Sequence, residues 1–256
     1  MSIRYDISHL LRDWDYLPGQ VVARRFKGRD GAEKLQLRVD LGVLQMNALG
    51  RPDGKRPLGS ESWFEAYKTQ LEQWKESHGG SDDAFTLGVL ECGRLQQETI
   101  QYHHRYICWF QLGDYDGVER DCERNSQVYQ FAANFAATEE LAWSLLQFVP
   151  QMVMMRTRAR GTAYLKKNQW NLALEAIREG LEELEAFLRD NGREEAIESS
   201  GEIASLRGWM EDVRNKKPLS ERETLERQLG EAIDSEDYEK AARLRDQLRR
   251  FQTPGA

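Results

Sequence analysis

The spacing of hydrophobic residues changes along the chain, and the first stretch has the two-residue period of a β-strand. Between residues 35 and 41, leucine or valine occupies every second position and a polar residue stands between them. This alternation predicts a half-buried strand. The segment Val21–Phe26, followed by an Asp-Gly turn at 30–31, predicts a β-hairpin with it. A third strand is expected within 41–49, so residues 1–59 are assigned to a small N-terminal β region.

From about residue 60 to 217 the period lengthens to three or four residues, which is typical of amphipathic helices. Ser60 predicts the start of the first helix and Gly79-Gly80 its end. Asp82 or Asp83 predicts the start of a long second helix that Gly113 ends. Four more helices are expected at 115–137, 139–167, 170–188 and 194–215, with Pro150 kinking or breaking the second of these four.

Two stretches of this helical region place a large aromatic residue nine positions before a small or β-branched one. The stretches are Gly161, Tyr164, Ala173 and Ile177, and Tyr106, Trp109, Val118 and Cys122. They resemble tetratricopeptide repeats, and they lie 55 positions apart (164 − 109), so the region is TPR-like rather than a regular array of ~34-residue repeats. The resemblance implies antiparallel helix pairs with a concave binding face. There Arg156 and Arg160 share one helix face and could clamp an acidic peptide or a carboxylate, unless salt bridges to neighbouring acids hold them.

The last zone, residues 218–256, predicts a helical hairpin. Leu225, Leu229 and Ile233 recur every four residues on a first helix, which Ser220 and Glu223 begin as a capping box. Asp234 or Ser235 is expected to cap the second helix, whose apolar stripe is Ala241, Leu244, Leu248 and Phe251. Two short helices are only marginally stable by themselves, because isolated helices below ~12–15 residues rarely persist in water. The hairpin must therefore pack on its own chain, on a second copy or on another protein.

Residues 225–251, LERQLGEAIDSEDYEKAARLRDQLRRF, resemble the UVR motif of the bacterial excision-repair proteins UvrB and UvrC. The resemblance covers about a tenth of the chain and implies a protein partner rather than a reaction. The expected partner-binding residues are Tyr238, Ala241, Leu244, Arg245, Leu248 and Phe251. The alternative is that the hairpin is a structural cap on the helical region.

Composition narrows the function classes. The chain has 256 residues, of which 31% are charged and 40% hydrophobic, and its net charge is −7. The acidic balance argues against a general nucleic-acid binder, which usually has a basic surface. Three widely spaced cysteines, Cys92, Cys108 and Cys122, favour reduced and buried thiols. With no apolar run of ~18 residues and no signal-peptide pattern, the expected location is the cytoplasm.

Candidate catalytic chemistry is sparse. His103, His104 and Cys108 come nearest to a metal cluster, but two adjacent histidines on a helix point about 100° apart, and a zinc site wants three or four ligands. The sequence has no phosphate-binding glycine loop, dinucleotide fingerprint or nucleophile elbow. We therefore expect no metal, no cofactor and no enzymatic activity.

The sequence thus predicts a mainly α fold with a small N-terminal β element (1–59), a TPR-like antiparallel helical domain (60–217) and a C-terminal helical hairpin (218–256). The expected function is that of an adaptor that binds protein partners through the hairpin and the concave helical face, with homo-oligomerisation possible. One alternative is an accessory protein of DNA excision repair or of a Clp-type stress-response system. Another is an enzyme whose site is assembled from distant residues.

Overall fold

A computed structural model describes residues 6–219 and 221–252. Its internal contacts divide the chain into two compact units, Met1–Met210 and Glu211–Ala256. We call the first unit the body. The chain is mainly helical, with one small antiparallel sheet near the N-terminus, as the sequence predicts.

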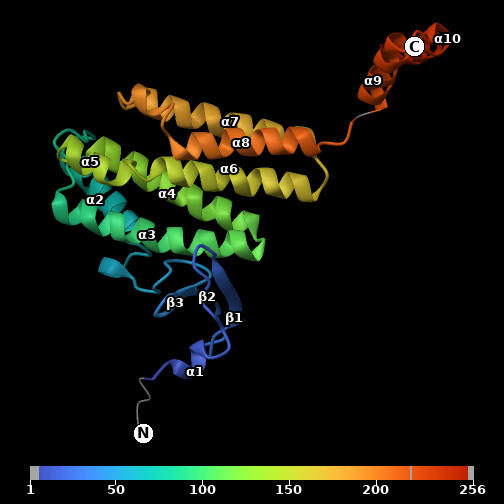
Figure 1. Cartoon of the computed structure of the whole chain (residues 1–256). Helices are drawn as coiled ribbons and strands as arrows, with labels where there is room; N and C mark the ends of the chain where they lie inside the picture. Colours follow the sequence, from blue (N-terminus) through green and yellow to red (C-terminus); the bar gives the residue numbers. More distant parts are fainter. Residues whose placement is uncertain (1–5, 220, 253–256) are drawn as a thin grey trace. The chain divides into compact units, whose positions relative to one another are not determined.

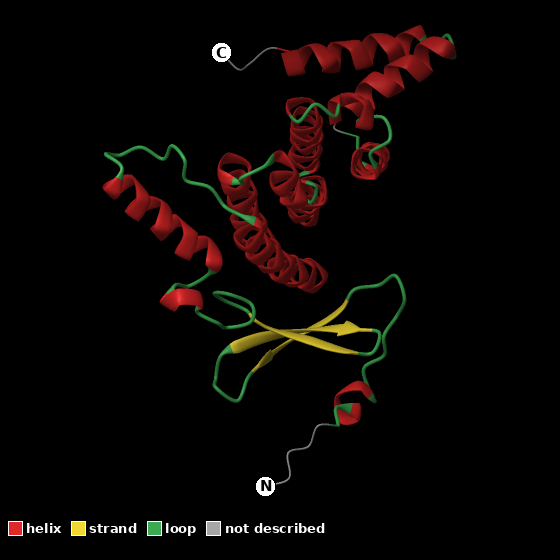
Figure 2. Ribbon diagram, turned by 90° about the vertical axis from the view of Figure 1, so that its left-hand side faces the viewer, coloured by secondary structure: helices red, strands yellow, loops and turns green. Residues whose placement is uncertain are grey.

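The sheet is a three-stranded antiparallel meander of β1 (Val22–Lys27), β2 (Glu33–Val39) and β3 (Gly42–Asn47). Leu35 and Leu37 of β2 lie in the core, and Met46 of β3 pairs with Leu35 on the neighbouring strand. The predicted alternation is not complete, because the polar Gln36 between the two leucines is also buried. Strands β1 and β2 pack on α3 (Val89–Leu112). The three strands lie as a layer beside the helices (Figure 2). A short helix, α1 (Ser8–Leu11), precedes them.

The helices of the body follow the predicted order with corrected starts. α2 (Trp63–Ser77) begins two residues later than expected, because Ser62 rather than Ser60 accepts the hydrogen bond from the Glu65 amide, at 3.1 Å. α3 starts at Val89 after Gly88, so neither Asp82 nor Asp83 caps it. Its predicted end is confirmed, because Gly113 has the left-handed conformation (φ 76°) that favours glycine.

The next helices are α4 (Tyr115–Phe135), α5 (Glu139–Leu146), α6 (Val149–Lys166), α7 (Trp170–Asp190) and α8 (Gly201–Lys216), whose last residues, 211–216, belong to the second unit. The predicted break at Pro150 is present, because the helix is interrupted between α5 and α6. Pro150 lies in the first turn of α6, where its missing N–H costs no helical hydrogen bond. The helix expected from Glu194 is instead a 3₁₀ turn (Glu194–Ala196) followed by α8.

Helices α3 and α4 pack as one antiparallel pair and α6 and α7 as another, with α4 against α6 between them (Figure 1). Close approach relies on glycine: a Cβ at Gly117 would lie 2.9 Å from the Trp109 ring, and one at Gly180 would lie 2.1 Å from Thr157 Oγ1. The Trp109 ring thus occupies space that glycine leaves open at position 117. The repeat interpretation of this region stays a prediction.

The second unit contains a hairpin of α9 (Glu221–Asp234) and α10 (Tyr238–Gln252), which we call the C-terminal hairpin. Ala232, Ala241 and Leu244 form its core, with Leu225 and Leu229 packed against them. The prediction that Ile233 continues the buried stripe is wrong: its side chain is 52% exposed. Relative to Leu225, position 232 is rotated by about 20° around a helix and position 233 by about 80°, so Ala232 stays on the buried side.

The cap of α10 also differs from the prediction. Asp237, rather than Asp234 or Ser235, accepts a hydrogen bond from the Lys240 amide at 3.0 Å. The Ser235 hydroxyl instead donates back to the Glu231 carbonyl. The predicted capping box of Ser220 and Glu223 lies outside the described residues and side chains.

Candidate functional site

The turn of the C-terminal hairpin exposes apolar side chains. Ile233, near the end of α9, is 52% exposed, and Tyr238, the first residue of α10, is 69% exposed. Between them the chain turns tightly through Glu236, which has a φ of 58°. We call Ile233, Tyr238 and the intervening turn the hairpin tip. An aromatic ring held this far out of its own core is available to a partner.

The structure separates the six predicted partner-binding residues into groups. Tyr238 and Arg245 are exposed and Leu248 is partly buried. Ala241 and Leu244 are corrected from partner contacts to core residues, because both are less than 9% exposed between α9 and α10. The side chain of Phe251 lies outside what the structure describes.

Residues 220–253 match the family model described as the UvrB/uvrC motif. The chain carries a UVR motif. The match spans α9 and α10, so the UVR motif and the C-terminal hairpin coincide. No curated protein and no solved structure matches the chain. A UVR motif suggests interaction with a protein or a DNA-related partner, and the exposed tip is where its apolar surface is accessible.

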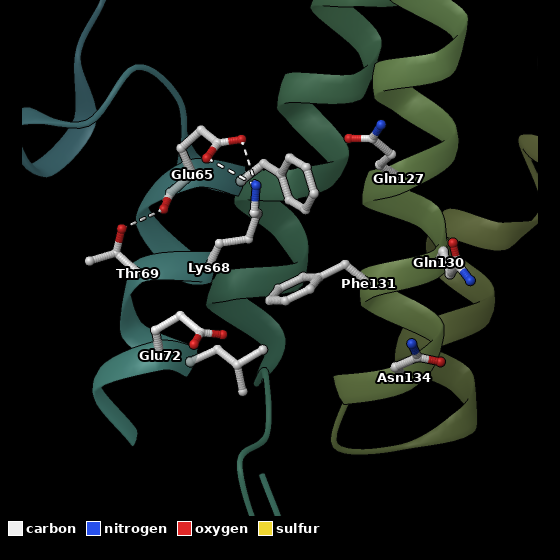
Figure 3. Close-up of a pocket in the computed structure, with 10 residues that line it drawn as sticks. Glu65, Lys68, Thr69, Glu72, Gln127, Gln130, Phe131 and Asn134 are labelled. Carbon is white, nitrogen blue, oxygen red and sulfur yellow. Dashed lines mark hydrogen bonds and ion pairs between the residues drawn. The ribbon is translucent and has the colours of Figure 1, made fainter. Parts of the chain in front are cut away.

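The body has a groove between α2 and α4, about 580 Å³ in volume. Its apolar part is made by Phe64 and Leu71 of α2 and Phe131 of α4, whose ring points toward α2 (Figure 3). Phe64 and Phe131 meet edge to face, with ring centroids 5.5 Å apart. Polar side chains form the rest of the lining: Glu65, Lys68, Thr69, Glu72, Gln127, Gln130 and Asn134.

The carboxamides along α4 give this groove hydrogen-bonding capacity. Gln130 and Asn134 make no side-chain hydrogen bond to another described residue, while Gln127 reaches Glu123 at 3.4 Å. Across the groove, Lys68 pairs with Glu65 at 3.2 Å. Carboxamides offer both donors and acceptors, which is what an extended peptide backbone requires.

The two arginines predicted to clamp an acidic group are already engaged. Arg156 is buried and hydrogen-bonds Glu183, with Glu123 3.9 Å away. Arg160 pairs with Glu119 of α4. Neither arginine lines the α2–α4 groove. A clamp on an external carboxylate stays a prediction, but it would have to displace these pairs.

The body buries a network of charged residues that the sequence analysis did not single out. Arg105 donates to both carboxylate oxygens of Asp121, at 2.7 and 2.8 Å, and its third nitrogen donates to the carbonyls of Asn47 and Gly50. Glu98, fully buried, accepts from the Trp63 amide at 2.8 Å. The network ties the loop after β3 to α2, α3 and α4. Its signal in the sequence is a charged residue on a buried stripe, as at Arg105 between Tyr102 and Trp109.

The residues considered for metal-binding chemistry, His103, His104 and Cys108, lie on α3. His103 Nδ1 lies 2.7 Å from the Tyr106 hydroxyl, and burial lowers the pKa of His103 to about 4. Burial raises the pKa of the Cys108 thiol to about 12. Among the described residues, no three His, Cys, Asp or Glu side chains gather as metal ligands.

Within the residues that the structure describes, no helix combines the length and apolar character needed to cross a membrane.

Proposed function

We propose that this protein is a non-enzymatic, cytoplasmic adaptor that binds a protein partner through its UVR motif. The observation that carries the proposal is the hairpin tip, where Tyr238 and Ile233 stand exposed beside a three-residue turn. The hairpin core, by contrast, consists of three small or medium side chains with two partly buried leucines. A unit with so little buried apolar surface gains stability when a partner covers its exposed side chains.

The proposal gives the aromatic side chain more weight than the charges around it. Tyr238 and Arg245 are both exposed on α10, and Arg245 has only Asp246, 3.8 Å away, as an ion-pair partner among the described residues. Aromatic anchors in an interface commonly cost ~2 kcal/mol or more on truncation, whereas charges at its edge contribute little. Tyr238 should therefore dominate the binding energy.

The test compares Tyr238→Ala with Arg245→Ala in quantitative capture of the same partner from the native cell extract. Tyr238→Ala should lose most of the partner and Arg245→Ala little, with the helical content of both unchanged by circular dichroism. Leu41→Ala is the matched control, because Leu41 is 89% exposed on the body. Loss from Arg245→Ala alone would contradict the proposal and favour an electrostatic partner such as nucleic acid.

Removal of residues 218–256 tests whether the UVR motif is a separable binding element. The shortened protein should keep a folded body and lose the partner. If it aggregates or loses the tryptophan fluorescence of the folded body, the hairpin is a structural cap instead. Phe251→Ala belongs to the same comparison, because the sequence places Phe251 on the apolar stripe of α10.

The α2–α4 groove is the second proposed binding place, for an extended peptide segment that packs an apolar side chain against Phe64 and Phe131. Two features support it: the apolar surface of the groove and the unused carboxamides of Gln130 and Asn134. Replacing both carboxamides by alanine should weaken capture of a partner that still binds after removal of 218–256. If capture of that partner is unchanged, this groove is not its binding place.

The process in which the adaptor works is open between two alternatives, an accessory role in DNA excision repair and one in a Clp-type stress response. The UVR motif supports both. The chemistry of the captured partner decides between them, since one requires a nuclease complex and the other a protease complex. If the hairpin mediates self-association, the captured partner would be a second copy of this protein.

A further inference from the structure

The loop that follows β3 encloses a small cavity lined by cationic side chains. Its volume is about 230 Å³, and its lining is Asn47, Leu49, Gly50, Arg51, Gly54, Lys55, Arg56 and Glu61. The lining contains three cationic side chains and one carboxylate, and Asp53 and Glu98 lie against Arg51, so Lys55 and Arg56 are the cations without an acidic partner among the described residues. We propose that this cavity binds a phosphate group, in the form of a small phosphate monoester. This inference goes beyond the adaptor function and does not depend on it.

The first argument is the state of the cationic side chains. Lys55 and Arg56 are exposed, and neither side chain has an ion-pair or hydrogen-bond partner among the described residues. Charged side chains of folded proteins usually find an acid nearby, as many arginines of this chain do. Two adjacent cations left unpaired over one cavity favour an anion there.

The second argument is Arg51, which lines the cavity and is only 8% exposed. Its Nε lies 3.1 Å from Glu98 Oε2 and 3.3 Å from Asp53 Oδ1, but neither contact has the geometry of a hydrogen bond. Its guanidinium makes no hydrogen bond to any other described residue. The two carboxylates offset the charge of Arg51, but buried polar groups are usually hydrogen-bonded, so its N–H groups still lack an acceptor of suitable geometry. A phosphate oxygen is the acceptor that a guanidinium fits best.

The third argument is the rigidity of the loop. Arg105, itself held by Asp121, donates to the carbonyls of Asn47 at 3.0 Å and Gly50 at 2.6 Å. Gly54 has a φ of 71°, and a Cβ there would lie 2.7 Å from Asn47 Nδ2, so the backbone passes close to that carboxamide. The cavity is therefore formed before a ligand arrives, which reduces the entropic cost of binding.

Charge and size select the ligand class. A phosphate monoester has a charge of about −1.5 to −2 at pH 7, which complements the two cations, Lys55 and Arg56, that have no acidic partner among the described residues. A carboxylate has one negative charge and a single pair of oxygens. The volume is below the ~300–1,000 Å³ of pockets for drug-sized ligands, so a single phosphate with a small organic group fits.

The test measures the affinity of the full chain for glycerol 3-phosphate by isothermal titration calorimetry at constant ionic strength, with glycerol and acetate as the comparison ligands. Saturable binding of glycerol 3-phosphate is expected, with at least a tenfold higher dissociation constant in the double variant Lys55→Ala, Arg56→Ala. The matched control is Lys27→Ala, Arg29→Ala, which removes the same charge from two exposed residues of the same region. This control should bind like the wild type.

Three results would overturn the inference: no saturable binding by the wild type, equal weakening in the two double variants, or equal affinity for acetate and glycerol 3-phosphate. Arg51→Lys supplies an independent measurement, because it keeps the charge and loses the planar guanidinium. Provided that its circular dichroism spectrum is that of the wild type, it should also weaken binding. Unchanged affinity in this folded variant would contradict the role given to Arg51.

Discussion

The body and the C-terminal hairpin are stabilised by different chemistry. In the body, charged side chains are buried beside aromatic rings and hydrogen-bonded on several sides, as with Arg105 and Asp121. In the hairpin, the buried side chains are alanine and leucine, and the large apolar residues of the tip face outward. Buried polar networks favour one arrangement, because every alternative leaves a charge unpaired. The body thus has a specific interior of its own, while the hairpin leaves apolar surface for another molecule.

The comparison can be tested because the two units have different spectroscopic probes. The seven tryptophans, at positions 14, 63, 74, 109, 143, 170 and 209, all belong to the body. Tryptophan fluorescence therefore reports on the body, whereas far-ultraviolet circular dichroism reports on the helices of both units. Transitions that do not coincide would indicate two cooperative units.

The largest effect is expected from Arg105→Met. Removing one partner of a buried ion pair leaves Asp121 charged and unpaired, which commonly costs ~3–5 kcal/mol. The fluorescence-detected urea transition should therefore move to much lower denaturant. Arg178→Met is the control, because its ion pairs with Glu175 and Glu182 are exposed. A similar shift in both variants would show that the buried ion pair contributes no more to stability than an exposed one.

The second-largest effect is a loss of folding stability at acidic pH. The neighbours of His103 are Tyr106, His104 and, across the same small cavity, Tyr129. Burial lowers the pKa of His103 from 6.5 to about 4, so the unfolded chain binds a proton more readily than the folded one. This contribution to stability is fully present above pH 6.5 and is lost as the pH falls toward 4. It is at most about 3.5 kcal/mol, at ~1.4 kcal/mol per pKa unit.

His103→Gln should remove that acid sensitivity. Urea unfolding at several pH values between 4.5 and 7, followed by fluorescence, should show a shallower pH dependence in the variant than in the wild type. His78→Gln, at an exposed position, is the control. Parallel pH profiles for wild type and His103→Gln would show that His103 is not the source of the acid sensitivity.

A smaller effect, confined to the hairpin, is expected from Leu244→Ala. Leucine-to-alanine changes in cores cost ~2–5 kcal/mol, and the lower end applies here because the cluster is small. Part of the ellipticity should be lost at lower temperature, with the fluorescence transition unchanged. A shift of the fluorescence transition would mean that the two units unfold together.

The smallest effect on stability is expected from Tyr238→Ala, since 69% of the residue is already exposed. Surface changes of this kind usually stay within ~0.5 kcal/mol. The thermal transition by circular dichroism should be nearly unchanged even though partner capture falls. Melting of the hairpin well below that of the wild type would instead make Tyr238 a structural residue.

The sequence predicts the elements of this fold better than it predicts their ends or their tertiary contacts. The three strands, the break at Pro150 and the end of α3 at Gly113 follow from local backbone preferences, and the structure has all of them. The start of α3 does not, because Asp82 and Asp83 are adequate caps locally and only packing decides that the helix begins at Val89. The Ile233 prediction is wrong for a different reason, because positions taken every four residues drift around a helix that has 3.6 residues per turn.

The candidate sites also differ in how far the sequence predicts them. The UVR motif is contiguous in sequence, so its residues can be recognised directly. Which of them face outward depends on the partner helix: Ala241 and Leu244 are buried only because α9 covers them. The α2–α4 groove and the cavity after β3 bring together residues that are distant in sequence or separated by a turn. A pattern along one element contains no information about these pairings.

The burial of the three cysteines has a consequence for reactivity. Cys92, Cys108 and Cys122 are at most 1% exposed, and burial raises the pKa of each thiol. Because the thiolate is the nucleophile, alkylating reagents and oxidants can attack these sulfurs only when the body opens. The rate of thiol modification would therefore report how often the body of the native protein opens. A single cysteine introduced into the C-terminal hairpin, where the sequence has none, would react first and could carry a label without altering the body.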